Sequence, residues 1–173
     1  MKNKLKKELR MMIQMKASKL KENSTLIKEK EMILYKQIIN HPLFIKSHKV
    51  AIYYPIKNEL SILNLLNLKN KLFLLPNIND EDELIFNKFS GTHLNGKYNI
   101  PISTDKEILK PDLIIIPCLA YYQKYRLGYG KAFYDRYLSV NKIPTIGIAL
   151  KECELDVDFS EAHDIKLDDI IAV

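Results

Sequence analysis

Residues 117–138 read PCLAYYQKYRLGYGKAFYDRYL, and this stretch decides how the rest of the chain can be arranged. It follows the apolar run 113–116, which has the length and composition of a buried strand, and residues 132–140 after it have the pattern of a helix. Two of the five glycines, Gly128 and Gly130, lie in the turn between them. The turn also contains Arg126, one of only three arginines in a chain that otherwise uses lysine. A guanidinium grips phosphate or carboxylate with two parallel hydrogen bonds, which lysine cannot do.

Further strands and helices are expected on both sides of this stretch. Helical spacing of apolar residues runs from residue 4 to about 20, and a second helix is expected from the Asn23 cap to about Asn40, with apolar residues including Met32 and Ile33 in the core. Residues 90–111 read as an irregular surface loop. The predicted fold is α/β: a single domain over residues 1–173 with a mostly parallel central sheet and helices on both faces. The other expected strands are residues 50–54, 72–75 (ended by Pro76), 84–89, 144–150 and 170–173.

Composition restricts the class of protein. No apolar run approaches the roughly 20 residues of a membrane span, and the basic segment 1–10 is not followed by the apolar region of a signal peptide. Cys118 and Cys153 provide neither a disulfide framework nor metal-ligand spacing. We therefore expect a cytoplasmic protein without a membrane partner, and a monomer. The net charge of +6 is spread along the chain, which favours a small anionic ligand over nucleic acid.

The glycine turn has the parts of a triphosphate site. Glycines at 128 and 130 let backbone N–H groups converge on an anion, and the following helix N-terminus adds further donors. Arg126 and Lys131 supply full charges, and Asp135 can hold Mg²⁺ together with phosphate oxygens. The residues alone leave a second interpretation open, which is a glycine turn with surface charges. The spacing does not match a Walker A loop, a dinucleotide fingerprint or an RNA-binding octamer.

Two other segments are expected near this turn. In a parallel sheet, ligands bind beyond the carboxyl ends of the strands, where the Pro55–Glu59 loop, the loop after Pro76 and the glycine turn would all lie. Lys6 and Arg10 are four residues apart and share one face of the first helix. A solvated basic face is the alternative interpretation of that pair.

At these residues the chain resembles the 5-formyltetrahydrofolate cyclo-ligase (methenyltetrahydrofolate synthetase) family, whose signature is similar to PGLAFD..G.RLGYGxGYYDRYL after an apolar strand. Weaker matches follow in order over nearly the whole chain. They are residues 6–10, 52–59, 72–76, 99–101, 151–152 and 164–173.

The resemblance implies an enzyme that converts 5-formyltetrahydrofolate to 5,10-methenyltetrahydrofolate with ATP and Mg²⁺, releasing ADP and phosphate. The formyl oxygen would be phosphorylated before nitrogen 10 closes the ring. The partner is then a small reduced folate. Two alternatives stay open: a member that binds folate or nucleotide without turnover, and a basic nucleic-acid-binding domain.

The resemblance also implies roles for individual residues. Catalytic roles fall to Arg126, Lys131 and Tyr134, and metal binding to Asp135 and Asp164. Folate contacts are expected from Tyr54, Glu59, Tyr129, Gly130, Lys131 and Phe133. ATP contacts are expected from Lys6, Arg10, Arg126, Leu127, Gly128, Tyr129, Gly130, Lys131, Ala132, Phe133 and Tyr134.

Three departures from the signature stand in this chain. The approach to Arg126 is one residue shorter and lacks a glycine, with Tyr122 where the family often has Asp. Phe133 replaces the first Tyr of the YYD triplet. Ala132 replaces a glycine, so a backbone position that needs positive φ would be strained.

Overall fold

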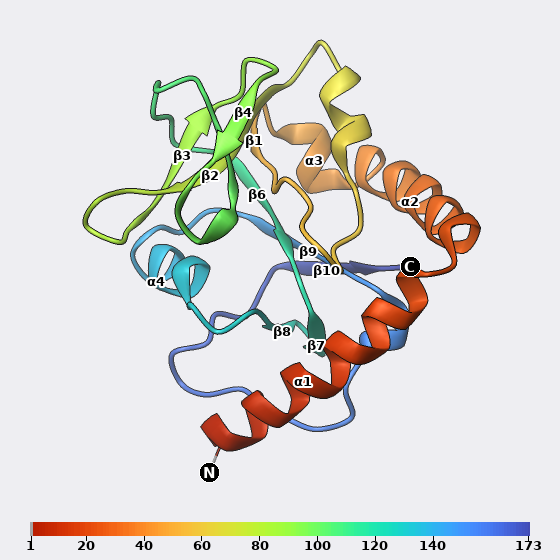
Figure 1. Ribbon diagram of the computed structural model, residues 1–173. Helices are drawn as coiled ribbons and strands as arrows, with labels where there is room; N and C mark the ends of the chain where they lie inside the picture. Colours follow the sequence, from red (N-terminus) through yellow and green to blue (C-terminus); the bar gives the residue numbers. More distant parts are fainter. Residues whose placement is uncertain (1) are drawn as a thin grey trace.

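The computed structural model describes residues 2–173, so Met1, with which the predicted domain begins, lies outside it. Its centre is a six-stranded sheet in the order β10-β9-β6-β1-β2-β3, in which all neighbours are parallel except β2 and β3 (Figure 1). The predicted mostly parallel sheet is therefore confirmed. The strands are β1 (Lys49–Ala51), β2 (Leu72–Ile78), β3 (Leu84–Lys88), β6 (Leu113–Pro117), β9 (Thr145–Ala149) and β10 (Asp169–Ala172).

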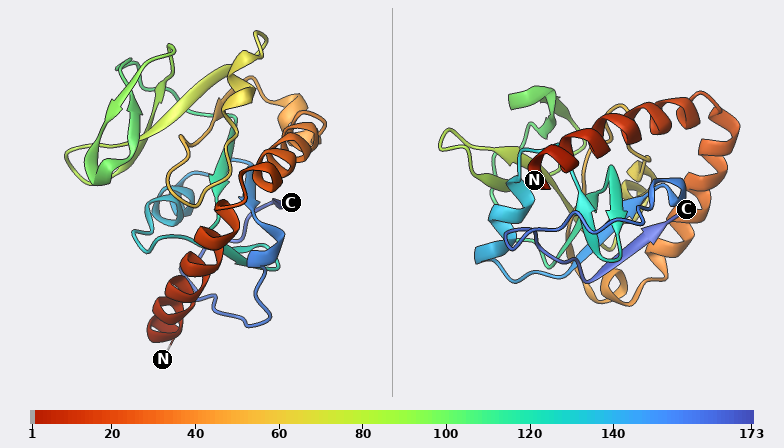
Figure 2. Two further views of the ribbon diagram at one scale, coloured as in Figure 1. Left: turned by 45° about the vertical axis from the view of Figure 1, so that its right-hand side comes forward. Right: turned by 90° about the horizontal axis from the view of Figure 1, so that it is seen from below.

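Helices cover both faces of the sheet, as predicted (Figure 2). In β6, Leu113 and Ile115 point into one core and Ile114 and Ile116 into the other, because successive side chains of a strand alternate. The first core contains side chains of α1 (Lys2–Lys21), α2 (Ser24–Ile39) and α3 (Pro42–Lys46), and the second contains those of α4 (Phe133–Val140). Each fully buried isoleucine contributes about 1.5–3 kcal/mol, so the two-sided burial of β6 makes it the anchor of the fold.

The predicted helices form with the expected ends. The Asn23 side chain accepts a hydrogen bond from the Leu26 N–H at the start of α2. Only one stripe of α2 is buried, at Ile27, Leu34 and Ile38. The prediction that Met32 and Ile33 belong to the core is wrong, because both lie on the other side of the helix and are more than half exposed. No helix within residues 2–173 is long and apolar enough to cross a membrane.

Strand β2 continues through Pro76, where the sequence predicted its end. The Leu74 carbonyl accepts from Ile52 N–H on the β1 side, and the Phe73 carbonyl accepts from Phe89 N–H on the β3 side. Alternation then turns the Pro76 nitrogen toward the β1 side, where β1 has already ended at Ala51. No ladder hydrogen bond is lost, so a proline is tolerated inside this strand.

Two small hairpins lie outside the central sheet. The predicted loop 90–111 contains β4 (His93–Asn95) and β5 (Pro101–Ser103), joined by the short 3₁₀ helix η2 (Lys97–Asn99). A second hairpin, β7 (Ala120–Tyr122) with β8 (Tyr125–Leu127), forms the shortened approach to Arg126. These three-residue strands carry no periodicity that a sequence pattern can detect. The remaining elements are the 3₁₀ helices η1 (Leu63–Asn67) and η3 (Lys151–Cys153).

Ala132 has left-handed backbone angles (φ 52°, ψ 22°) immediately before α4. The sequence predicted a strained position here, since a left-handed conformation costs an L-residue roughly 1–2 kcal/mol. That expectation is confirmed.

Replacement of Ala132 by glycine is expected to raise the free energy of unfolding by about 0.5–1 kcal/mol, because relief of the left-handed strain exceeds the entropy that glycine loses on folding. Chemical denaturation measures the change. Ala162→Gly is the matched control, since Ala162 is exposed and does not have positive φ. The control should lower stability, and a loss of stability in both variants would contradict the strain at Ala132.

Candidate functional site

A cavity of about 1320 Å³ opens at the carboxyl ends of β1 and β6. Its walls come from α1, the segment after β1, the β4–β5 hairpin, the glycine turn and the C-terminal segment at 163–164. The structure thus brings every residue of the predicted sites to one cavity. They are Lys6, Arg10, Tyr54, Glu59, all residues from 126 to 135, and Asp164.

Helix α1 contacts the glycine turn through Arg10. The Arg10 Nε donates to the Gly128 carbonyl at 2.8 Å, and the guanidinium lies against Gly130. Gly130 has φ of 98°, and a Cβ there would stand 3.4 Å from Arg10 Cζ. Burial, together with the nearby Arg126, lowers the pKa of Arg10, while Asp164 opposes that shift. Arg10 and Lys6 both line the cavity, so the shared helix face that was predicted for them points into the site.

Arg126 is buried beneath the turn, with 9% of its surface exposed. Its Nη2 donates to Asp135 Oδ2 at 2.6 Å, and its guanidinium lies 5.2 Å from the centre of the Tyr134 ring. A Cβ on Gly128 would come within 2.4 Å of Arg126 Nη1. A side chain at residue 128 would therefore force the Arg126 guanidinium to move, whereas the sequence suggested that this glycine leaves space for a ligand. The buried Arg126 Nε has no hydrogen-bond partner within residues 2–173.

Both predicted metal ligands are ion-paired. Asp135 is held by Arg126 and accepts from the Ile165 N–H at 3.2 Å. Asp164 Oδ2 lies 2.5 Å from the ammonium of Lys6 and accepts from the Glu161 N–H at 2.7 Å. Lys6, only 5% exposed, also pairs with Glu161 at 2.9 Å.

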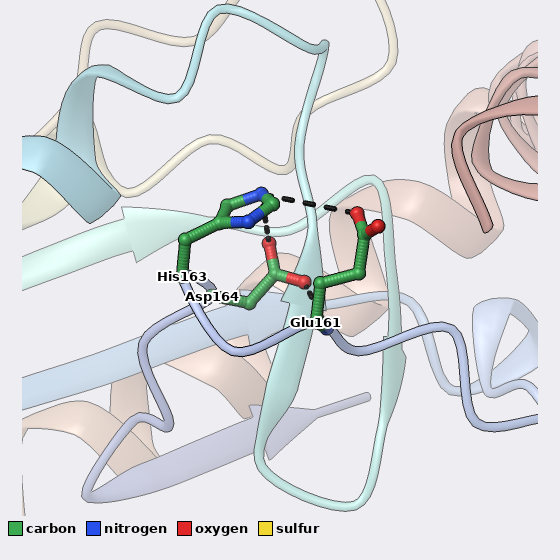
Figure 3. Close-up of side chains that lie close together, drawn as sticks. All are labelled: Glu161, His163 and Asp164. Atoms are coloured by element: carbon green, nitrogen blue, oxygen red, sulfur yellow. Dashed lines mark hydrogen bonds and ion pairs between the residues drawn. The ribbon is translucent and has the colours of Figure 1, made fainter.

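Asp164 belongs to a cluster with Glu161 and His163, whose ligand-type atoms all lie within 4.8 Å of one another (Figure 3). His163 Nε2 is 3.8 Å from carboxylate oxygens of both acidic residues. Sequence reasoning did not select Glu161 or His163, and their only signal was proximity to Asp164 in the chain. Carboxylate oxygens suit Mg²⁺, and in this structure those of Asp135 and Asp164 are paired with cations of the chain itself.

Glu59 lines the cavity from the segment after β1. Its Oε2 accepts from the Ile56 N–H at 2.9 Å, and burial raises the pKa of its carboxyl to about 7. The backbone hydrogen bond and the charge of Lys21 oppose that rise. A carboxyl group with this environment can recognise a donor edge of a ligand, and it would do so best when ionised.

Aromatic side chains form the wall next to the β4–β5 hairpin. Tyr54 packs against His93, with ring centres 4.1 Å apart. Tyr98 lies 5.6 Å from Phe133 and has the Lys131 ammonium 4.4 Å from its ring centre. Tyr98 was not among the predicted site residues, because it falls in a segment that the sequence showed only as a loop. This wall can hold a flat ring beside the charged turn.

Three comparisons place the chain among known proteins. The model of the 5-formyltetrahydrofolate cyclo-ligase family matches residues 2–173. A 5-formyltetrahydrofolate cyclo-ligase of Mycoplasma pneumoniae is 30% identical over 132 residues, which is 70% of this chain and 71% of that protein. The NMR structure of Aquifex aeolicus 5,10-methenyltetrahydrofolate synthetase has a TM-score of 0.84 and 28% identity over 97% of this chain and 89% of that one. A 5,10-methenyltetrahydrofolate synthetase from Mycoplasma pneumoniae has a TM-score of 0.73 and 27% identity over 96% and 97%.

The raised pKa of Glu59 predicts a pH-dependent stability. The folded state holds the proton more tightly than the unfolded state, so stability falls as the pH rises from about 4.5 to about 7. Glu59→Gln keeps the acceptor for the Ile56 N–H without the buried charge. We expect it to be more stable than the parent by about 1–3 kcal/mol at pH 8 and close to it at pH 4. Denaturant titrations at both pH values measure this, and an equal difference at both would refute the burial of an ionised Glu59.

Proposed function

Because the chain belongs to the 5-formyltetrahydrofolate cyclo-ligase family and is an enzyme of this kind, we propose that it uses ATP to convert 5-formyltetrahydrofolate to 5,10-methenyltetrahydrofolate, with ADP and phosphate as the other products. One observation carries the proposal. The residues expected to bind the folate and those expected to bind the nucleotide line the same cavity. A reaction that joins the two ligands requires this arrangement.

The reaction needs a phosphate acceptor and a ring closure. The formyl oxygen attacks the terminal phosphorus of ATP, and the bond from that phosphorus to the bridging oxygen breaks to release ADP. Nitrogen 10 then attacks the activated formyl carbon and loses its proton. The carbon–oxygen bond breaks, and phosphate leaves with the former formyl oxygen. The protein has to position the ligands and stabilise charge, so no protein nucleophile is required.

The nucleotide side is formed by α1 and the glycine turn. Lys131 presents a cation to the cavity from the glycine turn, and Arg10 presents one from α1. Lys6 lies one helical turn from Arg10 on the same helix. We assign the phosphates of ATP to these groups and to the backbone between residues 127 and 134. Burial raises the pKa of Tyr134, so its hydroxyl stays protonated and is a hydrogen-bond donor. This donor and the Lys131 ammonium would stabilise the charge that develops on the transferred phosphoryl group.

The folate side is formed by Glu59 and the aromatic wall. An ionised Glu59 would accept from the donor edge of the pterin, and Tyr54, Tyr129 and Phe133 would pack on its ring. The aromatic wall and the cationic turn lie side by side, since the Lys131 ammonium is 4.4 Å from the centre of the Tyr98 ring.

Mg²⁺ is the metal expected for such a site. Asp135 and Asp164 are the residues that would hold it, and the ion would neutralise part of the charge on the phosphates. We propose that the protein acts as a monomer. We also propose a cytoplasmic location and one domain over the whole chain.

Purified protein mixed with Mg-ATP and 5-formyltetrahydrofolate is expected to form the methenyl product, which absorbs near the edge of the visible range. Absorbance and ADP release should rise together, because one ATP is consumed for each ring that closes. Nucleotide binding without product would instead support a protein that binds its ligands without turnover.

Lys131→Ala is expected to cost about 2–4 kcal/mol of transition-state stabilisation, comparable to loss of one preorganised donor. This corresponds to a decrease in kcat/KM of roughly 30- to 900-fold. Lys142→Ala is the matched control, because Lys142 is exposed and lies outside the cavity. Steady-state kinetics measures the change. An unchanged kcat/KM in Lys131→Ala would exclude a role of Lys131 in stabilising the transferred phosphoryl group.

A further inference from the structure

The two carboxylates expected to hold the metal are each bound by a cation of the chain itself. Arg126 Nη2 is 2.6 Å from Asp135, and Lys6 Nζ is 2.5 Å from Asp164. The four side chains are between 6% and 14% exposed. Ion pairs with so little exposure are weakly screened by solvent, so a free metal ion has to compete with them directly.

Backbone donors also bind the two carboxylates. Asp135 Oδ1 accepts from the Ile165 N–H, and Asp164 Oδ2 accepts from the Glu161 N–H as well as from Lys6. Asp164 Oδ1 lies 3.8 Å from His163, whose side chain is 65% exposed. A metal ion that arrived alone would meet three oxygens that already have donors, and within residues 2–173 only Asp164 Oδ1 has none.

The local charge makes entry of a free dication less favourable still. The charged groups that interact with the two carboxylates, counted together with them, balance. A lone dication would leave a net positive charge, whereas a dication carried on a triphosphate brings more negative than positive charge. The phosphates would also offer new partners to the displaced cations. The groups counted are Lys6, Arg10 and Arg126 against Asp135, Glu161 and Asp164.

We propose that Lys6 and Arg126 are internal counter-ions of Asp164 and Asp135, and that the site admits a divalent cation only together with a polyphosphate that takes over the two basic side chains. This rests on the proposed function in one respect, which is that the cavity binds a triphosphate. The proposal adds to that function that Lys6 and Arg126 each alternate between a carboxylate and a phosphate. It also excludes binding of the metal before the nucleotide.

A second observation shows that Arg126 is equipped for a further partner. Its Nε is buried and unpartnered within residues 2–173, although Nη2 is bound to Asp135. A buried donor without an acceptor lowers the stability of the folded protein. A phosphate oxygen in the cavity would satisfy it, and Arg126 lines that cavity.

The test uses Mn²⁺ as the probe and electron paramagnetic resonance, which separates protein-bound from free or phosphate-bound ion. Mn²⁺ is added to the full chain alone and in the presence of inorganic tripolyphosphate. We expect protein-bound Mn²⁺ only in the second mixture. Asp135→Asn and Asp164→Asn should each reduce that signal. Equally tight binding of Mn²⁺ with and without tripolyphosphate would overturn the proposal.

Variants at Lys6 sharpen the result. Removal of the counter-ion in Lys6→Met should let Mn²⁺ bind in the absence of polyphosphate, at least about tenfold tighter than in the parent, which is within the usual range of coupling between sites. The double variant Lys6→Met/Asp164→Asn should lose this gain. Lys7→Met is the matched control, since Lys7 is the exposed neighbour on the same helix. A folded Lys6→Met protein that binds Mn²⁺ no better than the parent would also overturn the proposal.

Failure of this inference is distinguishable from failure of the proposed function. The metal experiment contains no folate, and the comparison in the parent protein remains decisive if Lys6→Met does not fold. A protein that forms the methenyl product but binds Mn²⁺ without polyphosphate refutes only the counter-ion proposal. A protein that binds Mn²⁺ only with tripolyphosphate but forms no product refutes only the reaction.

Discussion

The site depends on the buried pair of Arg126 and Asp135. It joins the last strand of the β7–β8 hairpin to the first turn of α4, and the glycine turn has to pass over it. Space above the guanidinium is available only because residue 128 lacks a side chain. A buried charge without its partner is strongly unfavourable, by about 3–5 kcal/mol when one member is removed. The pair therefore fixes the path of the turn and, with it, the position of Lys131.

The sheet provides the second constraint. Strand β6 is buried on both faces, and its neighbour β1 ends at Ala51, short of the length of β2. The chain must leave the sheet at these two carboxyl ends, which brings the Glu59 segment and the glycine turn to the same cavity. Helix α1 then closes the cavity from the side, because its Leu9 and Ile13 pack in the core while Arg10 reaches Gly128. The buried apolar side of α1 thus fixes the orientation of the helix, and with it the position of Arg10 at the cavity.

Much of this arrangement could be predicted from the sequence, and the successes and failures have physical reasons. Long apolar runs and a capped helix are local signals, so the sheet, α1 and α2 were expected. The hairpins β4–β5 and β7–β8 are too short to show a period. The position of Arg126 in the cavity was predicted, but its pairing with Asp135 was not. Sequence spacing shows which charged residues are close in the chain, but it does not show which of them are buried and therefore need a partner. The left-handed Ala132 was predictable only because a family signature has glycine there.

The proposed reaction requires the cavity to place the formyl oxygen against the terminal phosphate of ATP. The most direct measurement uses 5-formyltetrahydrofolate labelled with the heavy isotope of oxygen in the formyl group, followed by mass analysis of the released phosphate. If the formyl oxygen attacks phosphorus, the phosphate carries the label, one heavy atom for each methenyl product formed. Unlabelled phosphate, with the heavy oxygen found in water or retained in the folate, would exclude attack of the formyl oxygen on phosphorus.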